Sequence, residues 1–171
     1  MQLIESKTLT SAAASIEFTS IPQDGTDLVL LLSLRNTATA GGGGVTMFIR
    51  PNGSTTNFSS RALYGSGSSS ASFTGVGISF ANPSNYTANT FSNSSLYLPN
   101  YSGSTNKSIS GDTVNENNAT TADMAIHAGL WSNTSAITSI TMITDGGNLD
   151  IGSTISLYKI TKGSSGGVVV S

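Results

Sequence analysis

Few side chains in this sequence could carry out chemistry. The 171 residues include one His, His127, no Cys, and nine Asp and Glu residues in total. A Ser/His/Asp triad can be composed on paper because Ser is abundant, but a catalytic His must hydrogen-bond both a nucleophile and an orienting carboxylate. We expect His127 to be a hydrogen-bonded or interface residue, and we expect the protein not to be an enzyme.

The segment around His127 alternates in the manner of a β-strand. One face of residues 124–131 is apolar and is made by Met124, Ile126, Ala128 and Leu130. His127 and Trp131 share the opposite face, because successive side chains of a strand point to opposite sides. We therefore include His127 and Trp131 among the candidate interface residues.

The acidic residues and the glycine runs give only weak indications of a ligand. Asp145, Asn148 and Asp150 lie in a glycine-rich turn, but the spacing and terminal Glu of an EF-hand are missing, so we expect a hairpin turn. Asp112 and Glu116 fall on one strand face, too far apart for a retaining-glycosidase pair. Residues 41–44 are all Gly and lack the Lys and following helix of a phosphate-binding loop, which favours a mobile loop. We expect no metal and no cofactor.

Aromatic side chains could stack on sugars, as a receptor-binding protein would need, but we expect most to lie in the core or at corners. The residues concerned are Phe58, Tyr64, Phe73, Tyr86, Tyr97, Tyr101 and Trp131.

Charged residues make up 9% of the chain, against roughly 25% in an ordinary soluble domain. Surface charge keeps a free monomer soluble, so a chain this poor in charge is better suited to an assembly. The net charge of −2 offers no basic surface for nucleic acid or an anionic membrane. The absence of Cys fits folding in a reducing cytoplasm. The first residues lack a signal-peptide pattern, and the longest strongly apolar run, residues 28–32, is too short to span a bilayer.

The periodicity of the chain is that of strands. Ile16 and Phe18 alternate with polar residues, residues 28–35 are apolar on both faces at first, and residues 45–50 end at a Pro-Asn-Gly turn. Many short strands separated by turn residues predict one antiparallel β-sandwich of eight or more strands over residues 1–162, either jelly-roll-like or Ig-like. Residues 65–72 are almost entirely Gly and Ser, which predicts a loop or hairpin tip. Further strand candidates are residues 73–80, 91–98, 107–115, 124–131, 137–143 and 155–160.

The C-terminal segment, residues 163–171, is a Gly/Ser linker followed by Val168, Val169 and Val170. Three valines are unfavourable on a free tail, so we expect this arm to dock against a neighbouring subunit or another protein. The alternative is a frayed chain end. Val168, Val169 and Val170 complete the set of candidate interface residues.

Several segments together resemble a group of small β-rich virion proteins of tailed bacteriophages, common among phages of aquatic bacteria. The resemblance runs nearly end to end and is carried by residues 3–9, 18–22, 26–30, 98–101, 114–118, 129–131, 137–141 and 157–163. It implies a virion structural protein that is made in the cytoplasm of the bacterial host.

Two roles fit this resemblance. A capsid decoration (cement) protein would sit on the capsid exterior as a homotrimer and bind the major capsid protein, stabilising the shell against the pressure of packaged DNA. A tail-fibre or receptor-binding domain would instead recognise a host surface glycan. Fibres usually carry a long shaft, and this chain reads as one compact domain with a short arm, so we expect the cement role.

Overall fold

The protein is built entirely of β-strands and connecting loops. A computed structural model describes residues 1–75, 77–120 and 122–161, and this part of the chain contains twelve strands and no helix. The described ranges thus hold no helix able to cross a membrane. All paired strands run antiparallel, which confirms the predicted all-β antiparallel sandwich of eight or more strands.

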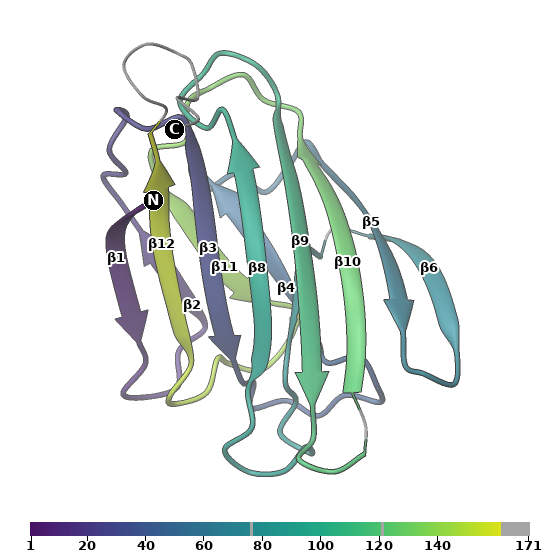
Figure 1. Cartoon of the computed structure of the whole chain (residues 1–171). Coiled ribbons are helices and arrows are strands. Elements are labelled where there is room, and N and C mark those ends of the chain that lie inside the picture. The colour runs from purple at the N-terminus through teal and green to yellow at the C-terminus, as the bar shows by residue number, and fades with distance from the viewer. Residues whose placement is uncertain (76, 121, 162–171) are drawn as a thin grey trace, which may run out of the picture.

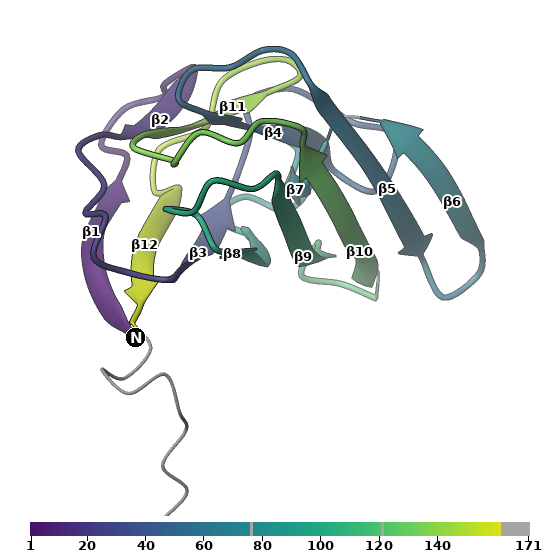
Figure 2. The same cartoon turned by 90° about the horizontal axis from the view of Figure 1, so that it is seen from above.

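The strands form two sheets that pack face to face (Figure 1, Figure 2). The larger sheet has the order β1-β12-β3-β8-β9-β10-β5-β6 and the smaller one the order β2-β11-β4-β7. The first six strands are β1 (Gln2–Thr8), β2 (Ser15–Phe18), β3 (Asp27–Leu34), β4 (Val45–Pro51), β5 (Phe58–Gly65) and β6 (Ser70–Gly75). The remaining six are β7 (Ser79–Ala81), β8 (Ser92–Pro99), β9 (Lys107–Glu116), β10 (Ala122–Trp131), β11 (Ile140–Thr144) and β12 (Thr154–Ile160).

Eight of the strands follow a jelly-roll path. The four strands β1-β12-β3-β8 of the larger sheet face the four strands β2-β11-β4-β7 of the smaller one. The chain changes sheet at each step of this core except between β4 and β7, which pair with each other. This order is that of a jelly roll, and it decides between the two alternatives that the sequence leaves open.

The other four strands are two hairpins inserted into that core. One hairpin, β5–β6, lies between β4 and β7 in the sequence, and the other, β9–β10, lies between β8 and β11. They meet where β10 pairs with β5, and together they continue the larger sheet beyond β8. Figure 2 shows the β5–β6 hairpin extending past the smaller sheet. We call these four strands the extension.

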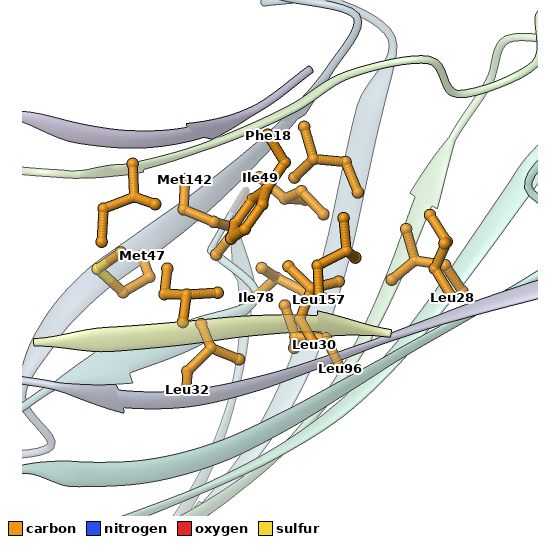
Figure 3. Close-up of a cluster of buried hydrophobic side chains, with 14 of the residues drawn as sticks. Phe18, Leu28, Leu30, Leu32, Met47, Ile49, Ile78, Leu96, Met142 and Leu157 are labelled. Atoms are coloured by element: carbon orange, nitrogen blue, oxygen red, sulfur yellow. The ribbon is translucent and has the colours of Figure 1, made fainter. Parts of the chain in front are cut away.

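The hydrophobic core lies between the two sheets of the jelly roll. Strand β3 buries Leu28, Leu30, Leu32 and Leu34 on its inner face, as its period-two pattern predicts. These leucines meet residues of the smaller sheet such as Met47 of β4 and Met142 of β11 (Figure 3). Burying a large aliphatic side chain contributes about 1.5–3 kcal/mol, so this cluster is the main source of stability.

The proposed C-terminal arm with Val168, Val169 and Val170 lies outside the residues that the structure describes. Its docking therefore stays a prediction. The described sandwich ends with β12 at Ile160.

Candidate functional site

His127 lies in the middle of β10, and its side chain points into the sandwich. Its neighbours across the sheet are Ala62 of β5 and Gly111 of β9, and its ring packs edge to face against Phe80, with the centroids 5.1 Å apart. Only 2% of the residue is exposed. The ring is thus inside the single chain, which corrects the expectation that it lies at an interface.

In the described part of the chain, neither ring nitrogen of His127, Nδ1 or Nε2, has a hydrogen-bond partner. No protein group in the described ranges therefore supports the alternative expectation of a hydrogen-bonded histidine. Burial lowers the pKa of His127 to about 4, and the negative charge of Asp112 opposes this shift. The imidazole is therefore neutral at neutral pH, because an isolated buried cation would lose its hydration.

A cleft opens beside His127, between the extension and strand β4. Its volume is about 310 Å³, and its lining residues are Thr46, Phe48, Ser60, Ala62, Phe73, Gly75, Gly77, Phe80, His127 and Asp145. The rings of Phe73 and Phe80 lie 6.2 Å apart in a tilted arrangement. A cleft of this size with aromatic walls suits a small, largely apolar surface such as the face of a sugar ring.

Trp131, at the end of β10, is a core residue. It is 1% exposed, its ring stacks on Phe58 with centroids 6.2 Å apart, and its Nε1 donates to the hydroxyl of Ser54 at 3.3 Å. Its place among the candidate interface residues is therefore corrected as well. The sequence pattern correctly predicts that Trp131 and His127 share one face of the strand, but it does not reveal that this face points inward.

The glycine loop at residues 41–44 is tied to the extension. The backbone N–H of Gly43 donates to the buried carboxylate of Asp123 at 3.2 Å, and the hydroxyl of Tyr86 donates to the same oxygen at 3.1 Å. Burial, together with a hydrogen bond to Asp123, raises the pKa of Tyr64 to about 12. Gly44 has a φ of +94°, so this loop has a defined turn geometry and is tied to Asp123; its expected mobility stays a prediction.

The outward face of the extension is apolar. Five large side chains on it are between 37% and 63% exposed: Leu63, Val114, Met124, Ile126 and Leu130. They are neighbours, because β10 pairs Met124 with Val114 of β9 and Ile126 with Leu63 of β5. A contiguous exposed apolar patch on a soluble protein marks an interaction site.

Three of the four acidic residues considered as ligands have other partners. Asp150 forms an ion pair with Arg35 at 3.7 Å, Glu116 accepts from the N–H of Asn118 at 2.6 Å, and the hydroxyl of Ser95 donates to Asp112. Across the described ranges no three His, Cys, Asp or Glu residues come together as a metal site would require.

Arg35 forms a buried centre that the sequence did not indicate. It follows β3 directly, and its guanidinium donates to the backbone carbonyls of Ser84, Tyr86, Thr87 and Thr90 at 2.8–3.1 Å. The side chain thereby holds the loop between β7 and β8. A lone Arg next to a predicted strand gives no sign of such a role, since its acceptors are backbone groups about fifty residues away.

None of the protein-family models, curated proteins and solved structures compared with this chain matches it. A jelly roll supports many unrelated functions, so function has to be inferred from the surfaces described above.

Proposed function

We propose that this chain is a structural protein of a tailed-bacteriophage virion, a decoration (cement) protein with no enzymatic activity. In this role it binds the outside of the shell of major capsid protein as a homotrimer. The observation that carries the proposal is the exposed apolar face of the extension on a domain with little surface charge. Such a face is unfavourable on a free protein and becomes useful once a partner covers it.

The mechanical role follows from added contact area. Packaged DNA presses outward on the shell and separates neighbouring capsomers, and a protein that bridges their seams opposes this motion. A contact of roughly 800 Å² on each partner is enough for specific, stable docking. Three copies related by symmetry multiply the effect, because each bound subunit raises the effective concentration of the next.

Copy number tests this role directly. We expect hundreds of copies in each purified virion, measured by quantitative mass spectrometry against the major capsid protein. We also expect the purified protein to bind isolated shells and to raise the temperature at which they release DNA, and removal of residues 163–171 to weaken that binding. A few dozen copies or fewer, or no binding to shells, would contradict the cement role.

The alternative role, recognition of a host surface glycan, is favoured by one observation. The cleft beside His127 has the size and the aromatic walls that suit a sugar ring. On this alternative, Phe73→Ala removes binding to host cells and to isolated host polysaccharide, whereas the cement role leaves shell binding by this variant unchanged.

A further inference from the structure

We propose that two copies of this chain pack face to face through the outward faces of the five strands β8-β9-β10-β5-β6. The contact is centred on β10, and its two-fold axis runs nearly parallel to that strand. The contact does not depend on a role in a virion. In a trimeric cement protein, it would connect neighbouring trimers.

The centre of the proposed contact is the apolar row on β10. Met124, Ile126 and Leu130 all project outward from this strand and are exposed. An axis along β10 places this row opposite the same row of the second copy. Self-complementary apolar rows are what a two-fold contact needs, because the same patch serves both partners.

Charged side chains lie on both sides of this row and have opposite signs. Arg61 of β5 pairs in the sheet with Ala128 of β10, and Asp112 of β9 pairs with Ile126. Both are exposed, and within the described part of the chain neither takes part in an ion pair. The two-fold axis brings Arg61 of each copy to the side of the other copy where Asp112 lies, so that two ion pairs enclose the apolar row.

The apolar residues beside the row repeat the same geometry. Leu63 lies two residues beyond Arg61 on β5, and Val114 lies two residues beyond Asp112 on β9. The offset between Leu63 and Val114 along β10 therefore equals that between Arg61 and Asp112. An axis along β10 keeps each residue at its level along the strands, so Arg61 lies one two-residue step from Asp112 of the second copy, and Leu63 lies one such step from its Val114. The long side chain of Arg61 spans that step. An axis across the strands would instead oppose like residues.

The available area is sufficient. The five strands from β8 to β6 contain six to ten residues each. At about 4.8 Å between strands and about 3.4 Å per residue, their outward face measures about 700 Å². This value is close to the roughly 800 Å² per partner of a standard interface. Over these strands the face carries three charged residues, Arg61, Asp112 and Glu116.

A charge exchange tests the contact. We expect Arg61→Asp and Asp112→Arg, each alone, to raise the dissociation constant of self-association at least about tenfold, because each places like charges together. The double variant should restore the wild-type constant, since it re-forms both ion pairs with their signs exchanged. Sedimentation velocity at a series of concentrations measures all three. Failure of the double variant to recover association would overturn the proposal.

A single cysteine gives an independent test, because the chain has none of its own. Ala128 is exposed on β10, close to the proposed axis, so Ala128→Cys should form a disulfide-linked dimer under mild oxidation. Ser33→Cys is the matched control, since Ser33 is exposed on the same sheet face three strands away, on β3. Equal rates of cross-linking for the two variants would contradict a contact centred on β10.

Discussion

Strand β3 of the jelly-roll core and strand β10 of the extension are both central strands of the larger sheet, but their two faces are used in opposite ways. The inner face of β3 is made of leucines. The inner face of β10 contains the buried polar residues Asp123 and His127, and its outer face exposes Met124, Ile126 and Leu130. The extension is thus more apolar outside than a solvated sheet face ordinarily is.

This difference indicates which part of the molecule stabilises the fold and which part contacts partners. The core strands are covered on their inner side by the smaller sheet, and their burial stabilises the domain. The extension strands contribute fewer large side chains to the core, chiefly Ile109 and Trp131, and present an apolar surface on their outer side as well. Insertions that leave a fold intact and change its surface are a common way for a fold to acquire a function.

The largest effect is expected from removing the buried anchor at the end of β3. Arg35→Met should lower the free energy of unfolding by about 3–5 kcal/mol, because four backbone carbonyls lose their donor and Asp150 loses its cation. Urea unfolding measures the change. Arg61→Met, on the exposed face of the extension, is the control and, at a protein concentration low enough to keep the chain monomeric, should change stability by less than about 0.5 kcal/mol. Equal losses in both variants would contradict the separation of core and extension.

The pH dependence of stability examines the inner face of β10. The pKa of His127 is about 4 in the folded chain, and the ordinary value is about 6.5. At a pH between these two values, the imidazole therefore carries a proton in the unfolded chain and none in the folded chain. Stability should therefore fall by about 2–3 kcal/mol as the pH is lowered from 7 to 4, and then level off. Urea titrations at several pH values should show that His127→Leu removes this fall in the free energy of unfolding between pH 7 and pH 4. An unchanged slope in that variant would show that the ring is not buried neutral.

The glycine loop allows a smaller test of the same region. Gly44→Ala should destabilise the protein by about 2 kcal/mol, because Gly44 has a positive φ and an added Cβ would lie 2.7 Å from the backbone oxygen of Ala81. Gly41→Ala is the matched control, since a Cβ there meets no atom within 4 Å. Thermal unfolding of the two variants measures the difference, and equally stable variants would mean that the loop is not anchored as described.

The fold was largely predictable because its signal is local. Alternation within segments such as residues 28–35 indicates strands whatever their partners are. Two details were missed. Residues 2–8 form edge strand β1, whose mixed residues give no clean alternation. The predicted strand 73–80 is split between β6 and β7, in different sheets, where Gly77 permits a close approach to Thr46.

The candidate site was predictable only in part. The pattern of residues 124–131 correctly separates Met124, Ile126, Ala128 and Leu130 from His127 and Trp131. It does not tell which face points inward, because direction depends on long-range sheet packing, and the apolar face is here the outer one. The placement of Arg61 and Asp112 on opposite sides of the apolar row could not be found either, since it arises only through the pairing of β5 and β9 with β10.

The smallest effect on stability and the most direct test of the account come from Ile126→Glu. Ile126 is 55% exposed, so the charge should alter the free energy of unfolding by less than about 0.5 kcal/mol. Sedimentation equilibrium of the folded protein should nevertheless show its assembly mass halved, from dimer to monomer or from hexamer to trimer. Leu31→Glu, on the outer face of β3, should leave the mass unchanged. An unchanged mass for Ile126→Glu would contradict the central claim that the outer face of the extension is an association surface.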